Sequence, residues 1–323
     1  MTARDVSVVI PIFNEVRNVA EVHRELAHVL DSLHGWRTEL IWVDDGSTDG
    51  SVEVLRDLVA QDTRSRVIRF RRNFGQTAAL AAGFDAARGS VIVTLDADLQ
   101  NDPADIPNLL RKLEEGYDIV NGWRRKRRDP FFRRVLPSRV ANWLISKVTG
   151  VRLRDYGCTL KAYRSDVVRN LSLHGELHRF IPALASWYGV DVAEVEVNHR
   201  PRLHGSSKYG LGRSLRVLID LITVKFLLGY GGRPAHVFGL SGFVLGLGGT
   251  GLMVVLGVER LFLGVPLGNR PIVLLGILLM VLGLQFIGIG LLAEMTMRVA
   301  SEASHLKTYV IREVIEGGSP SAL

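Results

Sequence analysis

Two long stretches near the C-terminus carry no charged side chain, and they limit the possible folds more than any other feature of the chain. Residues 235–258 form the first stretch, and residues 271–293 form the second, whose only strongly polar side chain is Gln285. About 20 consecutive apolar residues suffice for a helix to cross the hydrocarbon core of a bilayer. Because uncharged core helices of this length are uncommon in soluble proteins, the pattern predicts two transmembrane helices, joined as a hairpin by residues 259–270.

The charges around this hairpin predict its orientation. Cations lie on both outer sides of it, at Arg213, Arg216, Lys225 and Arg233 before it and at Arg298, Lys307 and Arg312 after it. The connection between the two stretches has only Arg260 and Arg270. Under the positive-inside rule, both termini and the chain before the hairpin lie in the cytoplasm. We therefore expect a protein of the inner (cytoplasmic) membrane with two spans.

Strands and helices alternate over the first part of the chain. Apolar runs predict strands at residues 6–12, 39–43, 67–70, 91–95 and 118–122. Apolar residues at helical spacing predict helices at residues 16–33, 52–59, 77–87 and 103–115. This alternation with short loops predicts an α/β domain that has a mostly parallel sheet with helices on both faces. The sequence contains neither the Gly-x-Gly-x-x-Gly fingerprint of dinucleotide binding nor a P-loop.

A pair of carboxylates follows the strand expected at residues 91–95. Asp96 and Asp98 are spaced i, i+2, so in an extended chain their side chains point to the same side. Open α/β sheets bind ligands in the crevice at the carboxyl ends of their strands. Two close carboxylates repel each other unless a cation lies between them, and Mg²⁺ or Mn²⁺ on a substrate diphosphate suits such ligands. The alternative is a solvated acidic turn, but the position after a buried strand favours a metal site.

Other polar and basic segments indicate anionic ligands. Five consecutive cations at residues 124–128 precede a basic amphipathic helix at 136–148, which either lies on a membrane surface or packs as an ordinary helix. The loop at residues 200–209 holds three cations, two hydroxyls and a glycine, which makes it a candidate phosphate clamp. The formal net charge of +7 would also suit nucleic acid. The cations gather beside the membrane-facing segments, however, and this favours a lipid surface over nucleic acid.

Five segments, taken in order, resemble the inverting GT-A glycosyltransferases of family 2. They are residues 8–15, 43–49, 72–76, Leu95-Asp96-Ala97-Asp98-Leu99-Gln100 and residues 202–209. With the terminal hairpin they are similar to the membrane-anchored polyprenyl-phosphate glycosyltransferases, the group of dolichyl-phosphate mannose synthase. Residues 155–164 and 180–182 look most like the bacterial undecaprenyl-phosphate aminoarabinose transferases.

The resemblance implies a fold and a division of the chain. The expected fold is α/β, with a Rossmann-like, mostly parallel GT-A domain in the cytosol, amphipathic interface helices and a C-terminal two-helix transmembrane hairpin. The expected divisions are a GT-A domain at 1–210, an interface helix at 211–233, the hairpin at 234–297 and a cytosolic tail at 298–323. By analogy with related proteins, we also expect a homotetramer.

The resemblance assigns candidate site residues as well. For the nucleotide sugar they are Pro11, Asn14, Glu15, Asp44, Asp45, Asn73, Gln76, Asp96 and Ala97. For Mg²⁺ or Mn²⁺ they are Asp96, Asp98 and Gln100. For phosphate on the donor or acceptor they are Arg124, Arg127, Arg128, Arg202, Ser207 and Lys208. The catalytic candidates are Asp98, Arg202 and Asp155, and Asp155 is either a base or positioning carboxylate or a structural cap or ion pair.

Together these roles predict transfer of a sugar from a nucleotide sugar, expected to be UDP-linked, to a polyprenyl phosphate such as undecaprenyl or decaprenyl phosphate. A phosphate monoester has a second pKa of about 6, so the acceptor is largely dianionic at neutral pH and has little need of a general base. One alternative is a processive polysaccharide synthase, but those enzymes have a Gln-x-x-Arg-Trp motif and more spans, and the motif does not occur here. A second is a non-catalytic nucleotide-binding membrane adaptor, which would tolerate loss of the paired carboxylates.

Overall fold

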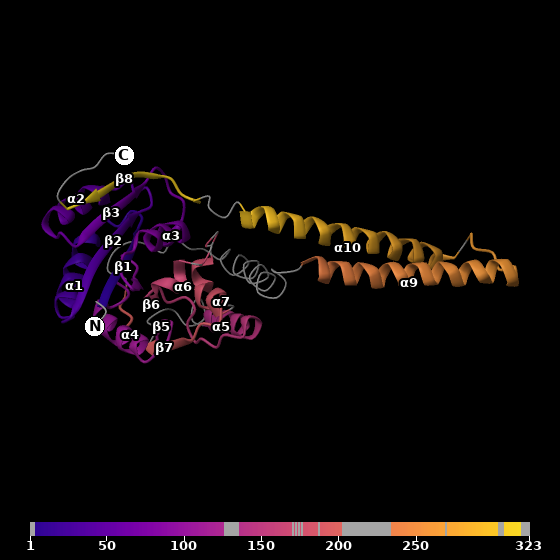
Figure 1. Ribbon diagram of the computed structural model, residues 1–323, viewed down its shortest axis with the longest axis horizontal. Coiled ribbons are helices and arrows are strands. Elements are labelled where there is room, and N and C mark those ends of the chain that lie inside the picture. The colour runs from indigo at the N-terminus through magenta and orange to yellow at the C-terminus, as the bar shows by residue number, and fades with distance from the viewer. Residues whose placement is uncertain are drawn as a thin grey trace. The chain divides into compact units, whose positions relative to one another are not determined.

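The computed structural model describes residues 4–125, 136–169, 171, 173, 175, 177–186, 188–201, 234–268, 270–302 and 307–317. The described residues form two compact units. The first combines the residues up to 201 with residues 307–317, and it is an α/β domain. The second consists of residues 234–302 and is a pair of long helices (Figure 1).

A mixed sheet, with eight strands among the described residues, forms the centre of the first unit. The strands are β1 (Arg4–Ile12), β2 (Trp36–Asp44), β3 (Ser65–Phe70), β4 (Val91–Thr94), β5 (Ile119–Trp123), β6 (Lys161–Arg164), β7 (Val192–Glu196) and β8 (Ile311–Glu316). Their order in space is β7-β5-β6-β4-β1-β2-β3-β8. The expected α/β fold with a mostly parallel sheet is confirmed, because β1 pairs in parallel with β2 and β4, β2 with β3, and β5 with β7.

Two antiparallel strands go beyond what the sequence patterns predict. Strand β6 lies between β4 and β5, and β8 pairs with β3 at the edge of the sheet (Figure 1). With four residues, β6 is too short for an alternating pattern to be recognised. Strand β8 follows the long helices in the chain, so its pairing with β3 joins segments that are remote in sequence. The α/β domain therefore includes part of the C-terminal tail.

Helices cover both faces of the sheet because successive residues of a strand point to opposite sides. On one face, α1, α2 and α4 pack against Val8 and Ile10 of β1. On the other face, α3, α6 and α7 pack against Val9. The helices are α1 (Val19–Asp31), α2 (Ser51–Gln61), α3 (Gln76–Ala86), α4 (Ile106–Glu114), α5 (Leu136–Thr149), α6 (Ser165–Arg169) and α7 (Ile181–Ser186), with short 3₁₀ turns η1 (Pro103–Asp105) and η3 (Leu177–Phe180).

The second unit is a hairpin of helices α9 (Pro234–Leu263) and α10 (Pro271–Glu302). Both helices are long and apolar enough to cross a membrane, and few of their side chains are buried. Large apolar side chains are exposed along them, such as Leu284, which is 73% exposed. Arg270 Nη1 donates to Glu259 Oε2 at 2.7 Å, where the chain turns from α9 to α10. An exposed apolar surface of this extent is typical of a membrane-facing surface.

Glycines allow close packing between these two helices. A Cβ atom at Gly283 would lie 2.6 Å from the backbone oxygen of Gly242. At Gly249 it would lie 2.7 Å from the backbone oxygen of Gly276. Such distances are too short for a carbon atom, so the backbones approach closely only because these residues have no side chain.

We predict that Gly283→Ala lowers the stability of the hairpin, by about 1–3 kcal/mol, because the added methyl group would force the helices apart. Gly288→Ala is the matched control in the same helix, since a Cβ there meets no atom within 4 Å. Thermal unfolding of the two purified variants in detergent measures the difference. Equal melting temperatures for both would show that the close approach at Gly283 does not stabilise the hairpin.

Candidate functional site

The parallel strands end at one edge of the sheet, and the acidic candidate residues lie there. The pairing of β1 with β2 places Ile12 opposite Asp44, and that of β1 with β4 places Val9 opposite Thr94. The loops that follow β1, β2 and β4 are therefore neighbours, as expected for the carboxyl ends of parallel strands.

Asp44 is completely buried at the end of β2. Its Oδ1 accepts a hydrogen bond from the backbone N–H of Ser47 at 3.1 Å. Its Oδ2 accepts no hydrogen bond from any described residue, although Arg69 Nε lies 3.6 Å away. Burial raises the pKa of Asp44, against the effects of its hydrogen bonds with Ser47 and of the charge of Arg69. A buried carboxylate oxygen of this kind can accept a hydrogen bond from a ligand.

The loop after β1 is tied to the loop after β2. Asn14 has a positive φ of 57°, and its Oδ1 accepts from the backbone N–H of Thr48 at 2.8 Å. The N–H of Asn14 in turn donates to Ser47 Oγ at 2.9 Å. The next residue, Glu15, donates its N–H to Ser51 Oγ at 3.0 Å. These hydrogen bonds hold Asn14 and Glu15 against the loop that follows Asp44. The half-buried Pro11 lies shortly before them, in β1.

Asp45 shapes the loop after β3. Its Oδ1 accepts from the N–H of Phe74 at 2.6 Å, and its Oδ2 accepts from the N–H of Gly75 at 2.9 Å. Gly46 has a φ of +75°, and a Cβ there would lie 2.6 Å from the backbone of Arg72. Both carboxylate oxygens of Asp45 thus bind backbone, while the predicted nucleotide-binding residue Asn73 lies exposed on the loop that Asp45 holds.

Gln76 and Asp96 meet between α3 and β4. Gln76 Nε2 donates to Asp96 Oδ1 at 2.7 Å, so the first residue of α3 orients this carboxylate. Asp96 is half-buried, and Ala97 beside it is buried. The structure therefore joins two predicted nucleotide-sugar residues that lie twenty positions apart in the chain.

Asp98 lies in a turn and not in an extension of the strand. Strand β4 ends at Thr94, and Leu99 has a positive φ of 60°. Strand alternation therefore does not decide where Asp96 and Asp98 point. Asp98 is 8% exposed, and its Oδ1 accepts from the N–H of Gln100 at 3.1 Å.

The two carboxylates of this turn suit a divalent ion. Among the described residues there is no group of three or more His, Cys, Asp or Glu side chains that could hold a metal ion. Mg²⁺ commonly needs only one or two carboxylates from the protein, since phosphates of the substrate and water complete its ligands. Asp96 and Asp98 can supply them, and for Gln100 the structure shows only backbone contacts, so its role as a metal ligand stays a prediction.

The start of the predicted phosphate loop is anchored beside this turn. The N–H of Arg200 donates to the backbone oxygen of Gln100 at 2.8 Å. The Arg200 guanidinium forms ion pairs of 2.7 Å with Glu25 and with Asp102. Of the three cations in the loop, Arg200 therefore serves as an anchor. The candidates Arg202, Ser207 and Lys208 lie outside the described residues, as do Arg127 and Arg128.

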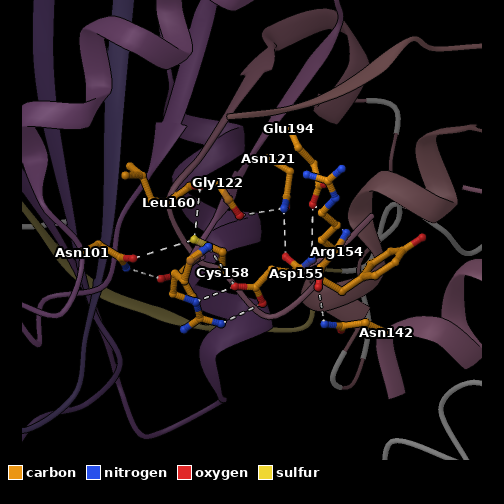
Figure 2. Close-up of polar contacts among 12 residues, drawn as sticks. Asn101, Asn121, Gly122, Asn142, Arg154, Asp155, Cys158, Leu160 and Glu194 are labelled. Atoms are coloured by element: carbon orange, nitrogen blue, oxygen red, sulfur yellow. Dashed lines mark hydrogen bonds and ion pairs between the residues drawn. The ribbon is translucent and has the colours of Figure 1, made fainter. Parts of the chain in front are cut away.

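Asp155 lies in a buried network of polar contacts that includes Asn121 of β5 (Figure 2). Its carboxylate accepts from Arg124 Nε at 2.7 Å and from Arg124 Nη2 at 3.0 Å. Asn121 Nδ2 donates to the backbone oxygen of Asp155 at 2.9 Å, and the N–H of Asp155 donates to Glu194 Oε1 at 3.2 Å. The ion pair with Arg124 agrees with the alternative that Asp155 has a structural role. It also engages the guanidinium of Arg124. A role of Asp155 as a base and a contact of Arg124 with phosphate therefore stay predictions.

Several polar residues near the site have no motif that would single them out. His178 Nδ1 and Thr77 Oγ1 are 2.8 Å apart, and both side chains are buried. His199 forms an isolated β-bridge with Asn101, just after the acidic turn, and is 6% exposed. His199 therefore lies in the interior, although a single histidine without metal-ligand spacing gives no sign of this in the sequence. Only the pairing of remote segments reveals these contacts.

Known proteins are similar to this chain over almost its whole length. The model of "Glycosyl transferase family 2" matches residues 7–172. A dodecaprenyl-phosphate galacturonate synthase of Rhizobium johnstonii is 43% identical over 324 residues, which cover 98% of this chain and 94% of that protein. An undecaprenyl-phosphate 4-deoxy-4-formamido-L-arabinose transferase of Edwardsiella ictaluri is 38% identical over 322 residues, 99% of this chain and 97% of that protein.

Solved structures share the fold of the first unit. Glucosyl-3-phosphoglycerate synthase from Mycobacterium tuberculosis, in complex with Mn²⁺, UDP and glucosyl-3-phosphoglycerate, superposes with a TM-score of 0.54. The match covers 70% of this chain and 80% of that one, at 19% identity. At this identity the likeness shows the GT-A-like fold alone.

We predict that Asp45→Asn destabilises the α/β domain by about 1–3 kcal/mol at neutral pH, because an amide has one acceptor oxygen and leaves one of two backbone N–H groups without a partner. Asp57→Asn is the control, since Asp57 is an exposed carboxylate on α2. Thermal unfolding in detergent measures both. If the two variants have the same melting temperature, the carboxylate of Asp45 does not stabilise the loop after β3.

We also predict a pH dependence that comes from Asp45. Burial raises the pKa of this carboxyl to about 6, against the hydrogen bonds from Phe74 and Gly75. The folded protein therefore binds this proton more tightly than the unfolded chain, whose carboxyl has a pKa of about 4. Ionisation of Asp45 then costs stability as the pH rises from about 4 to about 6, and the cost is constant above that range. Because the Asp45→Asn side chain does not titrate, the free energy of unfolding of wild type should fall relative to that of the variant as the pH rises through this range. A rise of the wild-type value relative to the variant would contradict the raised pKa.

Proposed function

The chain belongs to glycosyl transferase family 2 and, within it, to the polyprenyl-phosphate glycosyltransferases, and from this premise we propose that it moves a sugar from a nucleotide sugar to a polyprenyl phosphate at the cytoplasmic face of the membrane. The observation that carries the proposal is the Asp96–Asp98 turn, which lies at the ligand-binding edge of a GT-A-like sheet. The similarity to two such transferases over almost the whole chain supports the choice of acceptor.

The sugar is proposed from the same relatives. One of them is named for galacturonate and the other for 4-deoxy-4-formamido-L-arabinose, so these two sugars are the first candidates. For the donor nucleotide we propose UDP, on the resemblance of the sequence motifs. A protein of the same fold binds UDP and Mn²⁺, which is compatible with this choice.

The described residues can bind and orient the donor. Asp44 offers a buried oxygen to a hydrogen-bond donor on the base or ribose. Asp45 fixes the loop that carries Asn73, and Gln76 orients Asp96 near the diphosphate. A divalent ion held by Asp96 and Asp98 would act as a Lewis acid on the departing diphosphate.

Cations of the chain would bring the acceptor to the donor. Both substrates are anionic and repel each other, and arginine and lysine offset this repulsion. We assign this role to Arg202, Ser207 and Lys208, whose loop is anchored at Arg200 beside the acidic turn. The acceptor phosphate is already ionised and attacks without a general base. The reaction therefore does not require Asp155 as a base, and we assign it the role of buried partner of Arg124.

The hairpin would hold the enzyme where its acceptor is. We propose that α9 and α10 cross the membrane with both termini in the cytoplasm, following the positive charges outside the hairpin. Polyprenyl phosphate then presents its charged end at the bilayer surface on the same side as the α/β domain. Assembly as a homotetramer stays a prediction.

The test is a transfer assay with purified protein, Mn²⁺, and UDP-linked galacturonate or 4-deoxy-4-formamido-arabinose, offered to dodecaprenyl and undecaprenyl phosphate. Mass spectrometry should detect a lipid-phosphate sugar, and chelation of the metal should stop its formation. We predict that Asp98→Asn lowers kcat about 100-fold or more, since metal stabilisation of the leaving group contributes several kcal/mol. The control Asp57→Asn should turn over normally. Near-normal turnover of Asp98→Asn would rule out the metal role, and the absence of any lipid-linked product across a wider panel of nucleotide sugars would overturn the proposed function.

A further inference from the structure

A row of alternating charges crosses three neighbouring strands at the nucleotide edge of the sheet. The strand register places Asp44 of β2 opposite Arg69 of β3, and Arg69 opposite Glu313 of β8. Arg69 Nη1 donates to Glu313 Oε1 at 3.0 Å, whereas Arg69 Nε lies 3.6 Å from Asp44 Oδ2. The guanidinium is therefore hydrogen bonded to Glu313 but only paired in charge with Asp44.

Glu313 is fixed from its other side as well. Arg56 of α2 donates to Glu313 Oε2 at 2.6 Å, so the carboxylate lies between two arginines. Burial alone would raise the pKa of Glu313, but the hydrogen bonds from Arg69 and Arg56 outweigh it and lower the pKa. Glu313 thus stays charged and holds the Arg69 guanidinium toward β8.

The consequence for Asp44 is a buried oxygen that remains without a hydrogen bond in the described part of the chain. Asp44 is completely buried, and its Oδ2 accepts no hydrogen bond from any described residue. Arg69 could supply one by moving a few tenths of an ångström closer, and it is the nearest cation paired with this carboxylate. Since two carboxylates compete for one guanidinium, the contact with Glu313 keeps Arg69 from closing the gap.

The tail supports the neighbouring loop too. Tyr309, just before β8, stacks on Phe70 with ring centroids 5.0 Å apart. Phe70 meets the ring of Phe74 edge-on at 5.7 Å, and the N–H of Phe74 is bound by Asp45. Tyr309 also donates its hydroxyl to Asp85 of α3 at 2.7 Å. Residues 309–313 therefore contact the structures that carry both Asp44 and the loop that Asp45 holds.

We propose that the C-terminal strand β8 is a working part of the nucleotide site, in which Glu313 is a positioning residue that holds Arg69. Asp44 Oδ2 is thereby left without a partner among the described residues, as an acceptor for a hydrogen-bond donor on the base or ribose. The proposal rests on the proposed function, in which Asp44 binds the nucleotide. Neutralising Glu313 releases Arg69 to bind Asp44, and the nucleotide must then compete with an arginine for the same oxygen.

The experiment compares Glu313→Gln with wild type in the full chain, in detergent with Mn²⁺, by calorimetric titration of UDP and GDP. The nucleotide that binds wild type should bind the variant about tenfold more weakly, as expected for loss of one hydrogen bond to a charged group. In the transfer assay KM for the donor should rise by the same factor, while kcat and KM for the lipid phosphate change less than about twofold. Glu316→Gln is the matched control, because Glu316 lies in the same strand but pairs with Arg88 and should leave nucleotide binding unchanged.

A double-mutant cycle separates positioning from a merely structural role. If Glu313 acts through Arg69, then Glu313→Gln has no further effect on nucleotide binding in an Arg69→Gln background. A general loosening of β8 would instead lower the melting temperature and weaken binding equally in both backgrounds, which would overturn the proposal. Should Glu313→Gln fail to fold, Glu313→Asp keeps the charge but shortens the reach, and about threefold weaker binding is expected. Wild-type affinity in the folded variant would also overturn the proposal.

Asp44→Asn distinguishes this inference from the proposed function beneath it. If Asp44→Asn leaves nucleotide binding unchanged, the nucleotide role of Asp44 and the inference both fail. If Asp44→Asn weakens binding while Glu313→Gln does not, only the inference fails.

Discussion

The parallel pairing of β1 with β2 and β4 is the constraint on which the rest of the site depends. Backbone hydrogen bonds of these strands bring the loops after them to one edge of the sheet. Buried carboxylates lie there, and burial of charge is costly unless hydrogen bonds compensate it. Backbone N–H groups provide that compensation, from Ser47 to Asp44, from Phe74 and Gly75 to Asp45, and from Gln100 to Asp98. The same bonds shape the loops, so the charge and the geometry of the edge depend on each other.

The aspartates of the domain have different roles. Asp44 and Asp45 are adjacent, but only Asp45 uses both oxygens to bind backbone. Asp155 is paired with Arg124 through both of its oxygens. A carboxylate whose oxygens are engaged in this way contributes to structure, whereas a buried oxygen without a hydrogen bond calls for a further partner. Among the described carboxylates of this edge, Asp44 has a buried oxygen that accepts no hydrogen bond, and on this basis we propose it as the group that recognises the nucleotide.

The first unit is not a continuous stretch of chain. Residues that follow the hairpin return as β8 and complete the sheet next to β3, where Glu313, Arg69 and Asp44 form their row. The two ends of the hairpin thus both lead to the α/β domain in sequence. A C-terminal tail is commonly the most dispensable part of a domain, but here its strand pairs with β3 and its Glu313 binds Arg69.

Local patterns in the sequence were enough to predict the first five strands, the helices between them, the two apolar helices and the position of the acidic pair after β4. Apolar periodicity and uninterrupted length are properties of neighbouring residues, so 235–258 and 271–293 stand out, and so do the strands before Asp44 and Asp96. Resemblance of motifs added the family, which the similar proteins confirm. Only the tertiary structure decided that β6 and β8 join the sheet, that Asp45 binds a loop, that Asp155 pairs with Arg124, and that Glu313 lies beside Arg69. These features depend on which remote strands become neighbours, and that pairing is set by the packing of the whole domain and not by any local pattern.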